Sequence, residues 1–201
     1  MTISDRKARE KEQRRKAILT AAEKRFAREG YNATQLDSIA DDVEISKGTI
    51  YLYFKNKEDL FFSMIDEKIS TYYANLTAEI EQVESLENLI QRLVTYNLEH
   101  YRHQHHFIRL IMSEQVKVES QTHKKMRHQF LTKRNEYLDG IESKLAQYLP
   151  AKSTINPRSI ALTIVGAVNQ VIMDWLIQRR EPDLEKTKQD IIHIIVKGVK
   201  G

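Results

Sequence analysis

Apolar residues recur along the chain at the spacing of amphipathic helices. Ile18, Ala22 and Phe26 lie about one helical turn apart, and Gly30 follows where a C-terminal cap is common. A second stripe places its apolar residues at i, i+3, i+4 and i+7 over residues 36–43. The pattern therefore predicts a first helix that ends at Gly30 and a short second helix close behind it.

Residues that favour helix starts precede the next stripes. Thr34 stands at the N-cap position of the second helix, with Asp37 three residues later as in a capping box. Ser46 precedes a third short helix, which we expect to run to about Tyr53. Asn56 caps a long fourth helix, which has acidic residues in its first turn. Three short helices thus precede a long one.

Five further helices are expected in the remainder of the chain. Their apolar stripes begin near Leu86, Phe107, Met126, Pro157 and Leu184. The stripe near Phe107 counts as a separate helix because residues 101–106 resemble a junction. With only 6 Gly and 3 Pro and no convincing strand, the chain is expected to be all-α, with about nine helices forming an N-terminal three-helix unit and a C-terminal bundle.

Charge adds a possible partner to this picture. The net charge is only +4, yet residues 1–30 carry ten basic and five acidic side chains. A basic arm over residues 1–12 suits a phosphate backbone or an anionic surface, and a solvated charged tail is the alternative. The chain has no cysteine, which excludes disulfides and thiolate metal sites.

The second and third helices have the spacing of a helix-turn-helix. In that motif the first helix sets the angle, and the second inserts its N-terminal end into the major groove of DNA. Small residues at the start of the third helix, Ser46, Gly48 and Thr49, permit close approach of the backbone. Spacing alone leaves an ordinary packed helix trio as an equal alternative.

The literal residues favour DNA binding. Residues 33–62, ATQLDSIADDVEISKGTIYLYFKNKEDLFF, resemble the signature of the TetR (tetracycline-repressor) family, and the likeness extends over residues 14–65. It implies a DNA-binding domain, here residues 13–60, and a ligand-binding and dimerisation domain, residues 61–201. The protein is then a cytoplasmic transcriptional regulator, with a repressor released by a small effector as the leading interpretation. An activator or a non-specific DNA-binding protein is the alternative.

The resemblance also implies which residues contact operator DNA. They are Thr34, Gln35, Ser46, Lys47, Gly48, Thr49, Tyr51, Tyr53 and Lys57. Base reading would fall mainly to Lys47, Thr49 and Tyr51, while Lys57 would contact the DNA backbone as a point charge. The family usually has Gly where this chain has Glu44, and a non-Gly residue at positive φ costs about 1 kcal/mol.

No motif identifies the effector site. Candidate lining residues are the bulky or polar side chains on otherwise apolar helices: Tyr96, His100, Phe107, Phe130, Tyr137, Asn169 and Met173. Ordinary core packing is the alternative for each of them. The string GTIYLYFKNKED is similar to family members that control fatty-acid metabolism, so a fatty acid or an acyl-CoA is one expected effector and a hydrophobic drug is its rival.

Enzymatic and metal sites are not expected. The histidines at 100, 103, 105 and 106 have no carboxylate near them until Glu114, which favours a solvated turn over a metal site. No Ser-His-Asp order or phosphate-binding glycine loop is present, so we expect neither catalysis nor a cofactor.

The most apolar stretch points to a partner subunit. Residues 160–177 are apolar on two helical faces, while Asn169, Gln170 and Asp174 argue against a membrane span. We therefore expect a homodimer through the eighth and ninth helices, with burial inside one monomer as the alternative. The N-terminus lacks the apolar core of a signal peptide, which favours a cytoplasmic protein without membrane contact.

Overall fold

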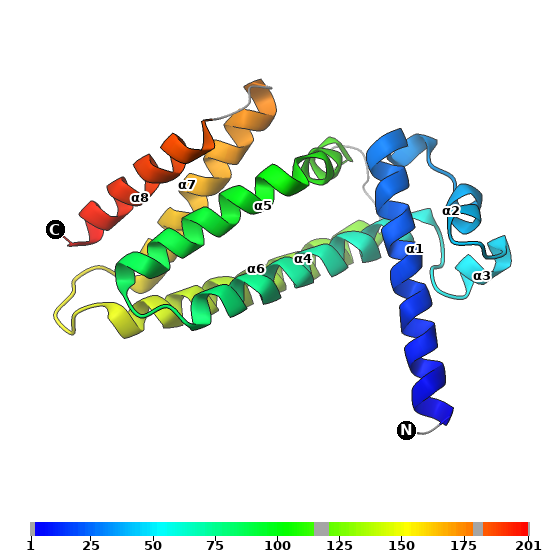
Figure 1. The fold of residues 1–201 in the computed structure, drawn as a ribbon, viewed down its shortest axis with the longest axis horizontal. Helices are drawn as coiled ribbons and strands as arrows, with labels where there is room; N and C mark the ends of the chain where they lie inside the picture. Colours follow the sequence, from blue (N-terminus) through cyan, green and yellow to red (C-terminus); the bar gives the residue numbers. More distant parts are fainter. Residues whose placement is uncertain (1–2, 115–120, 179–182, 201) are drawn as a thin grey trace. The chain divides into compact units, whose positions relative to one another are not determined.

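The structure, a computed structural model, describes residues 3–114, 121–178 and 183–200, and every regular element among them is a helix (Figure 1). The helices are α1 (Ile3–Ala33), α2 (Leu36–Asp42), α3 (Lys47–Tyr51), α4 (Lys57–Glu81), α5 (Leu86–Glu114), α6 (Gln121–Tyr148), α7 (Pro157–Gln178) and α8 (Leu184–Lys200). The predicted all-α class is confirmed. The chain divides into a first compact unit, residues 1–69 with 106–128, and a second, residues 70–105 with 129–201.

Two helix boundaries differ from those expected. The predicted junction at residues 101–106 is wrong, because α5 runs unbroken through it; the segment contains neither Gly nor Pro to end a helix. In the N-terminal unit, α1 begins at Ile3, so the described part of the basic arm is helical. Gly30 interrupts α1 with φ 78° and ψ 165°, a conformation essentially restricted to glycine. Counted as two stretches, α1 brings the described helices to the expected number.

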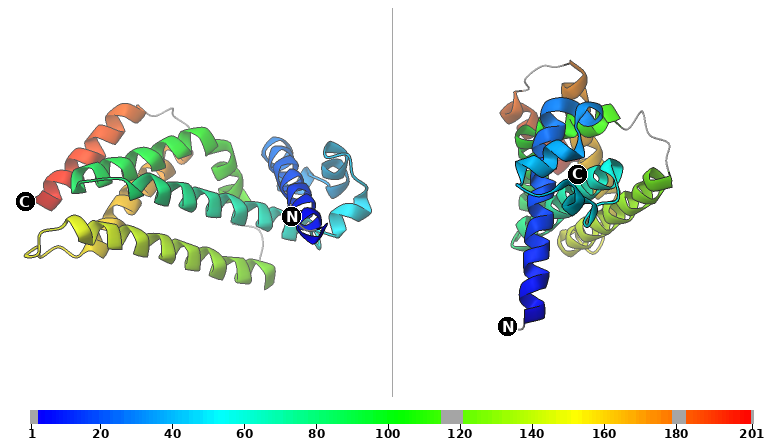
Figure 2. Two further views of the ribbon diagram at one scale, coloured as in Figure 1. Left: turned by 60° about the horizontal axis from the view of Figure 1, so that its bottom comes forward. Right: turned by 90° about the vertical axis from the view of Figure 1, so that its right-hand side faces the viewer.

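Aromatic rings dominate the core of the first unit. Phe26 of α1 lies 5.0 Å from Phe61 of α4 in an edge-to-face arrangement and 5.7 Å from Tyr31, between ring centroids. Ile18 and Ile39 are fully buried in the same cluster. α2 and α3 pack beside α1 around this core, which fixes the position of both short helices (Figures 1 and 2).

A bidentate ion pair between Arg25 and Asp42 joins α1 to the end of α2. The Arg25 guanidinium donates to both carboxylate oxygens of Asp42, at 2.5 and 2.7 Å, and to Glu29 at 2.9 Å. Hydrogen bonding from Arg25 lowers the pKa of the Asp42 carboxyl below its ordinary value. The pair therefore braces the two helices only while Asp42 is ionised.

Replacing Arg25 should produce a pH-dependent loss of stability. The depressed pKa of folded Asp42 means that the pair stabilises above the unfolded pKa, about 4, and that this contribution disappears as pH falls through the folded pKa. We expect Arg25→Gln to lower the thermal midpoint near pH 7. The difference in thermal midpoint between variant and parent should shrink as the pH falls toward 3. Circular dichroism melts test this, with Arg6→Gln, which removes an exposed pair within α1, as control. A gap that stays constant with pH would contradict the assignment.

The second unit is a helical bundle in which α6 packs along α4 (Figures 1 and 2). The Lys133 ammonium donates to the Ser70 hydroxyl at 2.6 Å, and near the other end of α6 the Tyr148 hydroxyl donates to the Val83 carbonyl. Leucines and isoleucines of these helices and of α5 and α7 form its buried core: Leu76, Leu89, Leu93, Leu138, Ile141 and Ile164. The bundle thus contains both apolar layers and polar ties.

α7 is the one described helix that is long and apolar enough to cross a membrane by length and composition. Core helices of bundles pass the same test, and six α7 side chains are buried by the chain itself: Ile160, Ala161, Ile164, Val165, Val168 and Trp175. The Trp175 ring lies 5.5 Å from the ring of Tyr101 on α5. These contacts identify α7 as a helix of the bundle.

Candidate nucleic-acid interface

The turn between α2 and α3 keeps a left-handed residue although the chain has Glu44 where the family usually has glycine. The amide of Ile45 donates to the Ala40 carbonyl at 3.0 Å, which closes the turn, and Glu44 adopts φ 54°. Of the two possibilities that the missing glycine left open, a rearranged turn or a slightly strained one, the positive φ of Glu44 fits the strained turn, in the left-handed region where glycine is favoured. The turn forms in spite of the missing glycine, and Glu44 points to solvent.

Ser46 starts α3 as predicted. Its hydroxyl accepts from the Thr49 amide at 3.2 Å and lies 2.8 Å from the Thr49 hydroxyl. This cap satisfies one of the free amides at the helix start and fixes the direction of the first turn. The remaining amides of that turn stay at an exposed helix end, where they can meet an anion such as phosphate.

One side of α3 is buried and the other is open. Ile50 is fully buried, whereas Lys47, Gly48, Tyr51 and Leu52 are exposed in two rows with i, i+4 spacing. Tyr51 is 48% exposed and Leu52 is 78% exposed. Leu52 was not among the expected contacts, although its spacing from Gly48 places it on the same side. A Cβ atom added at Gly48 would meet only the Ser46 hydroxyl, at 3.8 Å.

Lys47 is held at the edge of this surface. Its ammonium donates to Asp37, in the first turn of α2, at 2.8 Å. The Lys47 side chain is 59% exposed and the Asp37 side chain is 50% exposed. Hydrogen bonding with Asp37 raises the pKa of Lys47, so the ammonium keeps its charge. An ion pair exposed to solvent is weak, so the Lys47 ammonium can leave Asp37 and bind a base or a phosphate instead.

Thr34 does not have the role expected of it. Its side chain is 1% exposed and its hydroxyl donates to the Gly30 carbonyl at 2.8 Å. The N-cap position of α2 belongs to Gln35, which is exposed and makes no side-chain cap. Thr34 is therefore a buried residue whose hydroxyl satisfies a carbonyl near the end of α1. Gln35 remains accessible to a phosphate.

Lys57 also differs from the point charge expected for the DNA backbone. Its ammonium donates to three carbonyl oxygens, of Tyr31 at 2.9 Å, Asn32 at 3.2 Å and Thr34 at 3.1 Å, and lies 4.6 Å from the centre of the Tyr31 ring. All three ammonium protons are thus used within the protein. In this geometry Lys57 fastens the start of α4 to the α1–α2 junction, and a phosphate could reach it only by displacing those carbonyls.

The remaining residues expected at the interface, Thr49 and Tyr53, are partly accessible. Thr49 and Tyr53 are half-buried, and the Tyr53 ring lies 6.5 Å from that of Phe54, which is 2% exposed. Asn56 caps α4 as predicted, accepting from the Asp59 amide at 2.8 Å. The accessible candidates on this surface are therefore Gln35, Ser46, Lys47, Gly48, Thr49, Tyr51 and Tyr53, with Leu52 added.

The expected effector-lining residues do not form one group. Tyr96, His100 and Tyr137 gather around Tyr72 in the second unit, with ring centroids 5.7, 4.6 and 6.4 Å from it. Phe107 instead belongs to the core of the first unit, because α5 continues without a break. Phe130 and Asn169 are exposed and Met173 is half-buried. The first three residues remain candidates, while Phe107, Phe130 and Asn169 do not fit a buried pocket of the second unit.

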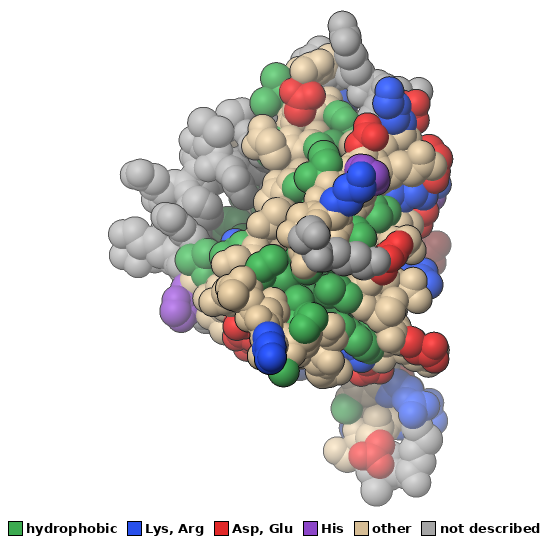
Figure 3. Space-filling view, turned by 90° about the vertical axis from the view of Figure 1, so that its left-hand side faces the viewer, with side chains coloured by type: hydrophobic (Ala, Val, Ile, Leu, Met, Phe, Trp, Pro, Cys, Tyr) green, Lys and Arg blue, Asp and Glu red, His purple; other side chains and the backbone are tan. Residues whose placement is uncertain are grey.

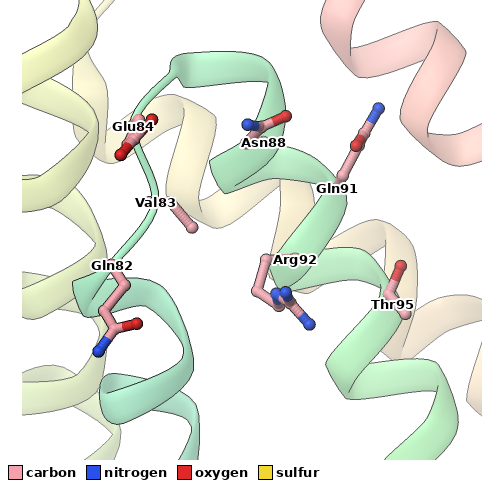
Figure 4. Close-up of a pocket in the computed structure, with 7 residues that line it drawn as sticks. All are labelled: Gln82, Val83, Glu84, Asn88, Gln91, Arg92 and Thr95. Carbon is pink, nitrogen blue, oxygen red and sulfur yellow. The ribbon is translucent and has the colours of Figure 1, made fainter.

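A surface pocket lies elsewhere in the second unit, where α4 turns into α5 (Figure 4). Its volume is about 430 Å³, and its lining residues are Gln82, Val83, Glu84, Asn88, Gln91, Arg92 and Thr95. The lining is mostly polar and includes none of the residues expected to bind an apolar effector. Among the described residues, no group of three or more histidine or acidic side chains could hold a metal ion.

Comparison with known proteins adds to this geometry. Residues 18–64 match the family model described as bacterial regulatory proteins, tetR family. The chain is 24% identical over 182 residues to the fatty acid metabolism regulator protein of Bacillus subtilis (strain 168), covering 90% of this chain and 93% of that protein.

Solved structures share the fold. The transcriptional regulator FadR from Bacillus subtilis, in complex with stearoyl-CoA, superposes with a TM-score of 0.71 at 21% identity, covering 91% of this chain and 98% of that chain. AibR, in complex with isovaleryl coenzyme A and operator DNA, superposes with a TM-score of 0.62 at 18% identity, covering 90% and 97%. At these identities the likeness establishes the fold alone.

Proposed function

The chain belongs to the TetR family of bacterial regulatory proteins. We propose that it is a homodimeric, cytoplasmic repressor, and that a long-chain acyl-CoA releases it from its operator. Its membership makes it a DNA-binding transcriptional regulator, and its relatives are regulators, not enzymes. The repressing direction, the effector and the dimer interface are the parts that we propose.

The exposed side of α3 carries the DNA-binding proposal. Ser46 caps a short helix whose Lys47, Gly48 and Tyr51 face solvent, while Ile50 anchors the opposite side in the core. A helix held in this way can enter a major groove with its N-terminal end first. Lysine can donate to guanine, and a tyrosine hydroxyl can donate to a base or a phosphate.

A relative and a solved structure, both from Bacillus subtilis, support the choice of effector. The first is named for the control of fatty acid metabolism, and the FadR structure contains stearoyl-CoA. A ligand of this kind acts as an effector when it binds more tightly to the conformation that fits the operator poorly. A hydrophobic drug is the rival effector, and an activator is the rival direction of control.

The dimer proposal rests on apolar side chains that α7 and α8 leave in water. Ile177 is 73% exposed and Ile194 is 69% exposed, with Leu162 at 44%. Figure 3 shows hydrophobic side chains gathered on the face of the molecule that it draws. A second copy related by a two-fold axis would cover the same residues on both subunits, which is the interface expected for a four-helix contact.

Replacing the exposed residues of α3 tests the function directly. Fragments selected from the genome of origin define the operator, and fluorescence anisotropy then measures affinity. We expect Lys47→Ala and Tyr51→Ala each to weaken operator binding by about 1–3 kcal/mol and to relax base preference.

The control is Lys152→Ala, at an exposed lysine of the second unit, which should leave affinity unchanged. Unchanged operator affinity in both α3 variants, with the fold intact, would refute the proposed interface. A non-specific DNA-binding protein would instead bind operator and random DNA alike, with a steep dependence on salt. Release of the operator by an acyl-CoA, and the direction of transcriptional change in a reporter assay, test the remaining parts.

A further inference from the structure

The second unit contains a group of polar aromatic side chains that DNA binding does not use. We call it the tyrosine cluster: Tyr72 and Tyr73 of α4, Tyr96, Asn97 and His100 of α5, and Tyr137 of α6. The rings of Tyr73 and Tyr137 stack at 4.6 Å, and those of Tyr72 and His100 lie 4.6 Å apart. α4, α5 and α6 therefore contact one another here through aromatic side chains that carry polar groups, and not through aliphatic side chains alone.

Asn97 organises part of this cluster. It is buried, with 9% of its surface exposed, and its Oδ1 accepts from the Tyr72 hydroxyl. Its Nδ2 donates to the Leu93 carbonyl of the preceding turn at 2.6 Å. These two bonds fix the amide and leave Tyr72 with a defined acceptor. A buried polar pair that is satisfied in this way holds its surroundings in one arrangement.

Tyr137 is the exception within the cluster. Its side chain is also 9% exposed, and its hydroxyl is buried with no hydrogen-bond partner among the described residues. The Tyr72 hydroxyl and the Asn97 amide lie near it, but neither has the geometry of a hydrogen bond with it. A buried hydroxyl without a partner costs free energy of folding, so its presence calls for an explanation beyond packing.

The protonation state of the tyrosines determines whether they can donate a hydrogen bond to a ligand. Burial raises the pKa of Tyr137 to about 12, and burial also raises the pKa of Tyr72 well above its ordinary value. Both phenols keep their protons near neutral pH, so Tyr137 presents a hydrogen-bond donor. The atom that complements it is an acceptor, such as the oxygen of a carbonyl group.

We infer that the Tyr137 hydroxyl donates a hydrogen bond to the carbonyl oxygen of the acyl group of the effector, with the Tyr72–Asn97 pair fixing the site around it. This inference rests on the proposed response to an acyl-CoA and adds to it the atom that recognises the ligand. A ligand bound at this hydroxyl would place the adjoining part of its acyl chain against the rings of Tyr72 and Tyr73, which lie 6.4 and 4.6 Å from the Tyr137 ring.

A matched pair of ligands isolates this hydrogen bond. Stearoyl-CoA carries the thioester carbonyl, and S-octadecyl-CoA has the same chain length and nucleotide but a thioether without that oxygen. Isothermal titration calorimetry on the full chain should give a dissociation constant for the thioether about five- to tenfold higher, the value of one hydrogen bond.

Tyr137→Phe removes the donor and keeps the ring. This variant should bind stearoyl-CoA about five- to tenfold more weakly and should no longer distinguish the two ligands. Its thermal midpoint should equal or exceed that of the parent, because the substitution removes an unpaired buried hydroxyl. The matched control is Tyr148→Phe on the same helix, whose hydroxyl donates to the Val83 carbonyl. That variant should lose thermal stability while still distinguishing the ligands.

The outcomes separate the inference from the function beneath it. Equal binding of thioester and thioether by the parent, or an unchanged preference in Tyr137→Phe, overturns the carbonyl contact while leaving an acyl-CoA regulator. A lower thermal midpoint in Tyr137→Phe would mean that the hydroxyl has a partner within the protein, and this too overturns the contact. Binding of neither ligand overturns the contact and the proposed effector together, while operator binding would still be tested by the α3 variants.

Discussion

Lys57→Met is expected to destabilise the first unit by about 2–3 kcal/mol, because it removes a charged donor from three carbonyl oxygens at once. Methionine keeps the length of the side chain but cannot donate, so the Tyr31, Asn32 and Thr34 carbonyls lose their shared partner. The contact between the ammonium and the Tyr31 ring is lost as well. Denaturant unfolding followed by circular dichroism measures the change.

Lys55→Met is the control, since Lys55 is an exposed lysine two residues earlier. It should leave the unfolding free energy within experimental error. If Lys57 served mainly as a phosphate contact, Lys57→Met would leave stability intact and would reduce the salt dependence of DNA binding by about one ion. That result would restore the role first implied by the family and remove the bracing role.

Ile194→Asp is expected to raise the dissociation constant of the proposed dimer by about a thousandfold. Each subunit would bury an unpaired carboxylate, and two-fold symmetry places the substitution in the interface twice, at about 2 kcal/mol each. Ile194 is exposed in the single chain, so folding of the monomer should be unaffected. Sedimentation equilibrium gives the dissociation constant, and affinity for an operator with two half-sites should fall with it.

Leu131→Asp is the matched control, because Leu131 is an exposed apolar residue, 43% accessible, on α6 instead of α7 or α8. It should leave the association state unchanged. Equal effects of the two substitutions would show that added surface charge, and not a covered interface, governs association. No change in either variant would remove α8 from the interface.

Sequence reasoning succeeded where a local pattern decides the conformation. Ser46 and Asn56 were identified as caps because a side-chain oxygen need reach only the amide three residues ahead. The position of Glu44 marked the turn as a place of possible strain, and the residue has positive φ. The opposed faces of α3 followed from helical periodicity, since Ile50 is buried and Lys47 and Tyr51 are exposed.

Sequence reasoning failed where a contact depends on residues distant in the chain or on the path of the backbone. The Lys57 ammonium donates to carbonyl oxygens of residues more than twenty positions before it in the chain. No pattern in the neighbouring sequence predicts these contacts. Thr34 had the residue type of a cap, but its side chain is buried and its hydroxyl donates to the Gly30 carbonyl, and Gln35 has the N-cap position. Phe107 moved to the other unit because α5 has no break, although its periodicity fitted a separate helix.

The open space beside Gly48 has a consequence for how this regulator can change its target. An added Cβ would touch only the Ser46 hydroxyl, at an ordinary contact distance, and the backbone at this position is helical. Alanine there would favour the helix by about 1 kcal/mol, so folding does not require the glycine. Alanine at this position is therefore compatible with the fold, so a change of side chain here can alter operator preference at little cost in stability.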